Sequence, residues 1–101
     1  MPYIKMEDRR ALEEGIYFMG RYIGLRADDV NLPGLLNYVI TRITLGAYQE
    51  KYGDPKYHHI NEIIGVLECA KQEMYRRVAG PYEDVASIKN GDLPEFEEWG
   101  D

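Results

Sequence analysis

Apolar side chains recur at helical spacing in the first half of the chain and predict two helices. The first covers residues 7–23, where apolar residues follow the spacing i, i+4, i+7 and i+11 of one helical face. The second extends to about Tyr52 from a start signal at Asn31 and Pro33. Its β-branched residues also suit a strand, but the helical spacing and the length between the end signals favour a helix.

The third predicted helix is the longest, with about 25 residues, or roughly 37 Å, between the start signal Asp54-Pro55 and the stop signal Gly80-Pro81. Its apolar stripe consists of Ile60, Ile63, Ile64, Leu67, Met74 and Val78. Lys71 lies within about 20° of the middle of this stripe at 100° per residue. Because an unpaired charge is costly to bury, we expect Lys71 to pair with Glu68 or with a carboxylate of another helix.

After Pro81 the regular apolar pattern ends. We expect a short extended piece at residues 87–89, a tight turn at Asn90-Gly91 and an acidic arm after it. The predicted fold is therefore an all-α three-helix bundle in residues 1–84, followed by an extended acidic C-terminal arm in residues 85–101.

Charge is distributed unevenly along the chain. Residues 1–80 contain 11 acidic and 11 basic side chains, whereas residues 81–101 contain seven acidic side chains and one lysine, and the net charge is −6. An acidic tail repels nucleic acid and anionic lipid, so we expect neither as a partner. A helix-turn-helix interpretation of the break at residues 53–55 fails as well, because Lys56 to His59 would form a thin base-reading surface on an acidic protein.

The composition and the chain start indicate a cytoplasmic protein. No apolar segment approaches the roughly 20 residues of a membrane span, and the N-terminus lacks a signal-peptide pattern. The single cysteine, Cys69, excludes an internal disulfide.

Polar residues beside the apolar stripe of the third helix form a candidate binding site. Asn61, Glu68 and Tyr75 are spaced seven residues apart, and Lys71 neighbours both Glu68 and Tyr75 at helical spacing. Arg42 of the second helix is a further candidate binding residue. In a pocket, a desolvated lysine would serve as an acid, a base or an anion anchor. In a structural role, Glu68 would neutralise Lys71 and Tyr75 would extend its hydroxyl to solvent.

The sequence predicts no catalytic residue, metal ligand or cofactor. Helical pyrophosphohydrolases of the MazG-like type bind magnesium through Glu-Glu-x-x-Glu and Glu-x-x-Asp patterns, but here Glu13-Glu14 is followed by Tyr17, and the acidic residues of the third helix are five or six positions apart. His58-His59 are adjacent and point about 100° apart, so they cannot chelate one metal ion together. Cys69 lies opposite the apolar stripe, with no base placed beside it.

Several short motifs are spread over most of the chain. They are Pro2-Tyr3-Ile4, Leu36-Asn37-Tyr38-Val39-Ile40-Thr41, the segment 61–71, Tyr75-Arg76-Arg77, Pro81-Tyr82-Glu83-Asp84 and Asn90-Gly91-Asp92. In these motifs the chain resembles a family of small uncharacterised helical proteins from prokaryotes and phages. The resemblance implies a compact helical fold and supplies no activity and no catalytic residues. The acidic stretch after Leu93 departs from the pattern.

Two classes of function remain open. The favoured one is a non-catalytic interaction or assembly module that forms a homo-oligomer. A 101-residue chain has a modest core, and nine of its twelve aromatic residues are tyrosines, which are enriched at interfaces. The alternative is a binding protein or hydrolase for a small nucleotide-like or anionic molecule, which would use the polar stripe. An ordered anion or metal at Glu68 and Lys71 would favour the alternative, whereas an apolar face buried between subunits would favour the module.

Overall fold

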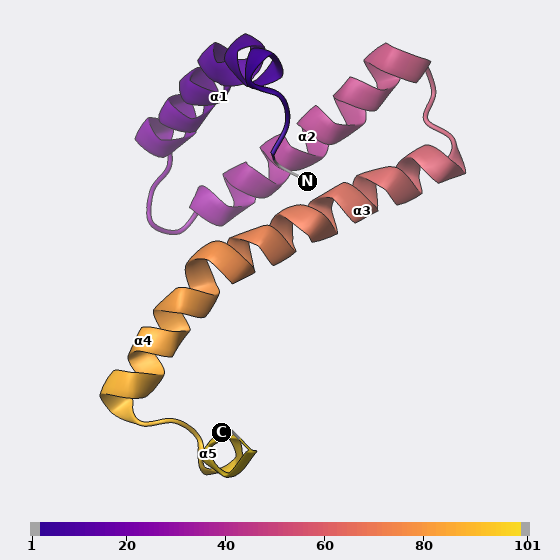
Figure 1. Ribbon diagram of the computed structural model, residues 1–101. Helices are drawn as coiled ribbons and strands as arrows, with labels where there is room; N and C mark the ends of the chain where they lie inside the picture. Colours follow the sequence, from indigo (N-terminus) through magenta and orange to yellow (C-terminus); the bar gives the residue numbers. More distant parts are fainter. Residues whose placement is uncertain (1–2, 100–101) are drawn as a thin grey trace. The chain divides into compact units, whose positions relative to one another are not determined.

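Every regular element in the described part of the chain is a helix, so the prediction of an all-α protein is confirmed (Figure 1). The structure is a computed structural model that describes the backbone of residues 3–99 and the side chains of residues 3–97. The elements are α1 (Met6–Arg26), α2 (Leu32–Tyr52), α3 (Tyr57–Met74), the π-helix η1 (Tyr75–Ala79), α4 (Gly80–Asn90) and α5 (Pro94–Trp99). The chain divides into two compact units, unit 1 (Met1–Gly65) and unit 2 (Val66–Asp101).

In unit 1, α1 packs against α2 as a helical hairpin. The two helices begin and end close to the predicted positions, and α1 continues three residues beyond Ile23. The buried side chains in the described part of unit 1 are Ile23 (7% exposed), His59 (7%) and Ile63 (6%). The predicted α1 stripe therefore contributes Ile23 to the core, while Leu12 and Ile16 lie exposed.

The loop between α1 and α2 is closed by reciprocal hydrogen bonds between Asp28 and Asn31. The Asp28 carboxylate accepts the backbone N–H groups of Val30 and Asn31 at 2.8 and 2.7 Å, and the Asn31 side-chain oxygen accepts the Asp28 N–H at 2.8 Å. Asn31 directly precedes α2, as predicted. Its side chain, however, makes its hydrogen bond within the loop and not to the first turn of the helix. These hydrogen bonds lower the pKa of Asp28, those from Asn31 and Val30 being the main causes.

The apolar side chains of α2 lie in two environments. Leu35 and Val39 are half-buried, whereas Leu36, Ile40 and Ile43 are exposed. The β-branched segment is helical, as predicted, and the Thr44 hydroxyl donates to the carbonyl oxygens of Ile40 and Thr41 at 2.8 and 3.1 Å. That hydroxyl is thus satisfied within its own helix.

The corner between α2 and α3 differs in detail from the prediction. Gly53 ends α2 with a φ of 78°, a conformation that glycine adopts without strain. The first turn of α3 begins after Lys56, whose carbonyl accepts the N–H of Ile60 at 3.1 Å, so the predicted start at Asp54-Pro55 is wrong by two residues. The cap is supplied from inside the helix, because His59 Nδ1 accepts the Lys56 N–H at 3.0 Å.

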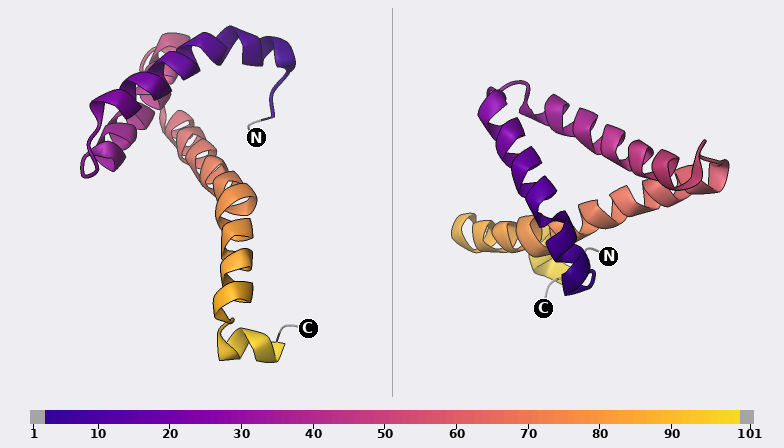
Figure 2. Two further views of the ribbon diagram at one scale, coloured as in Figure 1. Left: turned by 90° about the vertical axis from the view of Figure 1, so that its left-hand side faces the viewer. Right: turned by 90° about the horizontal axis from the view of Figure 1, so that it is seen from above.

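The predicted helix stop at Gly80-Pro81 is wrong. Helical structure continues from α3 through η1 into α4, and the ribbon is unbroken there (Figure 2). A proline inside a regular α-helix lacks an N–H, and its ring collides with the carbonyl four residues earlier. The π-turn relieves both problems by widening the helix, with the Gly80 N–H bonded to the carbonyl of Tyr75 five residues before it. Gly80 allows this approach, since a Cβ there would lie 3.1 Å from the Tyr75 oxygen.

The C-terminal region is helical where an extended arm was expected. Residues 87–89 lie in α4, which ends at Asn90, and Gly91 follows it with a φ of 89°. Asn90-Gly91 therefore ends a helix rather than forming a hairpin turn. Residues 94–99 form the short helix α5. At its start, the carbonyl oxygen of Leu93 accepts the backbone N–H groups of Phe96 and Glu97. Glu98, Trp99 and Asp101, which belong to the predicted acidic arm, have side chains outside the described part.

Candidate binding surfaces

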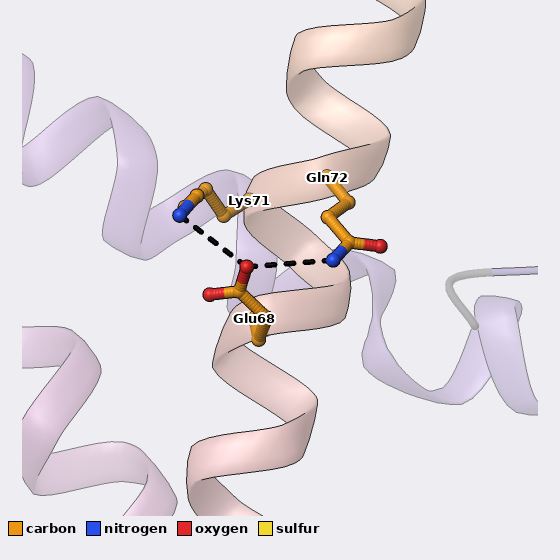
Figure 3. A network of polar contacts seen from close by, with 3 residues as sticks. All are labelled: Glu68, Lys71 and Gln72. Atoms are coloured by element: carbon orange, nitrogen blue, oxygen red, sulfur yellow. Dashed lines mark hydrogen bonds and ion pairs between the residues drawn. The ribbon is translucent and has the colours of Figure 1, made fainter.

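The predicted polar stripe of the third helix contains one close ion pair. Lys71 Nζ lies 3.3 Å from Glu68 Oε1, and the Gln72 side-chain amide donates to the same oxygen at 3.4 Å (Figure 3). The side chains are largely solvent-exposed, at 74% for Lys71 and 50% for Glu68. An ion pair exposed to this degree is screened by water and contributes little to stability.

The other predicted site residues have partners away from this pair. The Tyr75 hydroxyl donates to Glu83 Oε2 at 3.3 Å, across the π-turn. In unit 1, the Arg42 guanidinium donates to the Tyr38 hydroxyl at 2.7 Å and lies 5.5 Å from the centre of its ring. Asn61, also in unit 1, is exposed. The contacts thus join Glu68 to Lys71 and give Tyr75 and Arg42 other partners.

An aromatic cluster at the α2–α3 corner was not predicted. The His59 ring stacks on Tyr52 with a centroid distance of 4.3 Å and an interplanar angle of 15°, and it lies 5.7 Å from Tyr48 and 4.1 Å from His58. The sequence does carry a signal for it, because Tyr48 and Tyr52 are one turn apart at the end of α2 and the next helix starts a few residues later. The cluster is a structural joint between two helices, since His59 is buried and its Nδ1 is already an acceptor.

The surroundings of Tyr48 disfavour ionisation of its phenol. Its desolvation raises the pKa of the phenol, with further increases from the negative charge of Glu62, from Tyr52 and from a hydrogen bond with Glu62.

The candidate metal ligands do not gather. Among the described residues, no group of three or more histidine, cysteine, aspartate or glutamate side chains is placed to hold a metal ion. Cys69 is a free, exposed thiol.

Two open hollows lie on the surface, each lined by a single helix. One, of about 160 Å³, is formed on α1 by Phe18, Arg21, Tyr22 and Leu25. The other, of about 240 Å³, is formed on α4 between Tyr82 and Asn90. In the α1 hollow, the Phe18 and Tyr22 rings stack with a centroid distance of 6.1 Å and an interplanar angle of 18°.

Many apolar side chains are exposed on the remaining helix surfaces. The stripe predicted as the buried side of the third helix buries Ile63, whereas Ile60, Ile64, Leu67, Met74 and Val78 are exposed. In unit 2 none of the described side chains is buried. In the part of the chain that the structure describes, no helix is both long and apolar enough to cross a membrane.

These features define a small all-α protein with an ordered helical joint and extensive apolar helix faces. The chain belongs to the family described as a domain of unknown function (DUF6899), whose model matches residues 1–93. The prediction of an uncharacterised family is thereby confirmed, and the match ends at Leu93, directly before α5. No curated protein and no solved structure matches the chain.

Proposed function

We propose that the protein is a non-catalytic module that self-associates through its exposed apolar helix faces. The observation that carries this proposal is the scarcity of core within each unit. Unit 1 buries Ile23, His59 and Ile63 among its described side chains, and the described part of unit 2 buries none. Folding must offset a conformational entropy cost of about 1–2 kcal/mol per residue, and burial of apolar surface is the main term that does so.

The outer face of α2 has the pattern of a helix–helix interface. Leu36, Ile40, Ile43 and Ala47 follow the spacing i, i+4, i+7 and i+11, and each of them is exposed. Such a row forms a ridge that packs into the groove of another helix. On α3, Ile60, Ile64 and Leu67 form a second exposed row with the same spacing. A second copy of the chain offers matching rows, as a self-complementary interface requires.

Ligand binding at the polar stripe has weaker support. Glu68 and Lys71 already neutralise one another at 3.3 Å, and both are largely in water. Water competes with any anion for a lysine in that environment, so the pair lacks the desolvation that makes a lysine a strong anion anchor.

The test is the mass of the purified protein in solution, measured by light scattering and native mass spectrometry. We expect a species larger than the 11.7 kDa chain at tens of micromolar. Ile43→Glu places a charge on the outer face of α2 at a side chain that is 55% exposed, so it spares the core of the monomer. We expect it to weaken association by tenfold or more, or about 1.4 kcal/mol.

Gln49→Glu is the matched control, because it adds the same charge to an exposed position on another side of α2. It should leave the mass unchanged. A wild-type chain that is monomeric and cooperatively folded at this concentration would contradict the proposal. Native mass spectrometry also reports any retained ligand, which would instead support the alternative function.

A further inference from the structure

The hollow on α1 is an apolar surface beside positive charge. Phe18, Tyr22 and Leu25 supply its apolar wall, and Arg21 completes the lining. The wall is pre-organised, because Phe18 stacks on Tyr22 and the Arg26 guanidinium lies 5.9 Å from the centre of the Tyr22 ring. Ordering such side chains in advance lowers the entropy cost of binding.

The charged residues of the segment that carries the hollow are both basic, and Glu14 and Asp28 flank this segment in the sequence. From Gly15 to Ala27 the chain contains Arg21 and Arg26 and no acidic residue. A binding partner must therefore bring apolar side chains for the wall and negative charge for the arginines.

The segment at the start of α5 has that chemistry. Leu93 and Phe96 are three residues apart, which places them on one side of a helical turn, and both are at least half exposed. Glu95 and Glu97 flank Phe96, and the whole of residues 91–101 contains no basic residue. An acidic segment with a phenyl anchor thus complements a basic hollow with an aromatic wall.

We propose that the α1 hollow of one chain binds residues 93–97 of a second copy. Phe96 packs against Leu25 and the Phe18–Tyr22 wall, and the glutamates pair with Arg21 and Arg26. This contact rests on the self-association proposed above and adds a second, electrostatic contact to it. Its polar part weakens as salt is raised, since the charges lie at the rim.

The proposal is tested by cross-linking two single-cysteine chains. Both carry Cys69→Ser, which removes the exposed native thiol. One carries Gly24→Cys, at an open position directly before Leu25 in the sequence, and the other carries Pro94→Cys at the first residue of α5. After the two chains are mixed, a short bismaleimide should join them into a covalent heterodimer. Gly65→Cys is the matched control, because it is also an open glycine position but lies on α3, and it should give far less product.

Charge reversal identifies the contact. Arg21→Glu in the Gly24→Cys chain should reduce the cross-link several-fold, and Glu95→Arg with Glu97→Arg in the Pro94→Cys chain should restore it. Equal yields from Gly24→Cys and Gly65→Cys, or a yield unaffected by Arg21→Glu, would overturn the proposal.

Three further outcomes would also overturn it, and they distinguish failure of this contact from failure of the proposed function. One chain carrying both Gly24→Cys and Pro94→Cys that cross-links to itself at high dilution would show that the hollow binds the chain's own α5. An oligomer by native mass spectrometry without any 24–94 cross-link would reject this contact while keeping self-association. A monomer by the same measurement would reject self-association itself.

Discussion

Asp28 and Asn31 hold the α1–α2 loop by satisfying backbone N–H groups of their own segment. The Asp28 carboxylate accepts two of these groups, and each bond is stronger when the carboxylate is charged. Turns of this kind favour aspartate and asparagine because their short side chains reach the backbone a few residues on.

We predict that the loop makes stability depend on pH in the acidic range. The pKa of Asp28 is lowered from 3.8 in the folded chain, so its contribution is complete well above pH 4 and is lost as the pH falls through the folded value. Asp28→Asn keeps the acceptor oxygen and removes the charge. Urea unfolding from pH 6 to pH 3 should show a steeper loss for the wild type than for Asp28→Asn. Parallel curves would contradict the prediction.

His59 has two separable roles, as the acceptor for the Lys56 N–H and as a ring stacked on Tyr52. We predict that His59→Phe, which keeps a ring and leaves that N–H without its acceptor, destabilises the chain by about 1–3 kcal/mol. His59→Gln keeps an acceptor and loses the stacking, and His59→Ala loses both and should be the least stable. Urea unfolding at neutral pH gives the ranking, and a His59→Ala variant as stable as either of the others would contradict it.

At the residue scale, sequence reasoning succeeded where a contact depends on local spacing. The Glu68–Lys71 pair follows from an i, i+3 separation in any helix. The contacts of His59 could not be predicted in this way, because they depend on where α3 starts. The helix starts at Tyr57 and not at the predicted Pro55. Tyr75 was placed with Lys71 by its spacing, yet its hydroxyl bonds to Glu83 eight residues away, a contact that exists only because of η1.

At the element scale, the π-turn explains why the strongest stop signal in the sequence does not stop the helix. The rule that proline ends a helix assumes that the preceding turn is a regular α-turn. Here the five residues of η1 change the hydrogen-bond pattern before Pro81, and the absence of a Cβ at Gly80 makes room for the Tyr75 carbonyl. Helix positions up to Met74 could therefore be predicted, whereas the continuation through α4 could not.

We predict that Gly80 and Pro81 are energetically coupled. Alanine is about 1 kcal/mol better than glycine inside a helix, but at position 80 its Cβ would meet the Tyr75 oxygen at 3.1 Å. Gly80→Ala alone should thus bring no gain or a loss. With Pro81→Ala, the segment can return to α-geometry, and the same alanine should then stabilise by about 1 kcal/mol. A double-mutant cycle by urea unfolding measures the coupling, and additive effects of the two substitutions would refute it.

At the scale of the whole molecule, each unit has more apolar surface than it buries. Sequence periodicity identified the apolar faces correctly, but it cannot distinguish a face that packs within the chain from one that packs against another chain. On α2, the exposed row Leu36, Ile40 and Ile43 lies beside the half-buried Leu35 and Val39, and the helical spacing alone does not separate the two. For the same reason, periodicity alone does not support the prediction that the helices pack together as a three-helix bundle.

We predict that thermal stability depends on protein concentration. If the exposed faces are covered by a second copy, dilution favours the dissociated chain and lowers the melting temperature. A tenfold dilution changes the free energy of a dimer by about 1.4 kcal/mol, which corresponds to several degrees for a domain of this size. Circular dichroism at 2 μM and 50 μM would detect this shift in melting temperature. Ile43→Glu should have a lower melting temperature that depends less on concentration. A wild-type melting temperature that does not change with dilution would argue for a stable monomer.

The π-turn also sets where this helix tolerates a change in length. The turn between Tyr75 and Ala79 contains one residue more than an α-turn. Tyr75 and Glu83 are eight residues apart in sequence, but they are placed as two residues seven apart would be in a regular α-helix. Loss of one residue from this turn, together with replacement of Pro81, would convert the bulge to an ordinary turn and leave the phase of α4 intact. The same deletion within α3 would rotate every later side chain by about 100°. Natural length variation within this helix is therefore expected to be confined to the segment 75–79.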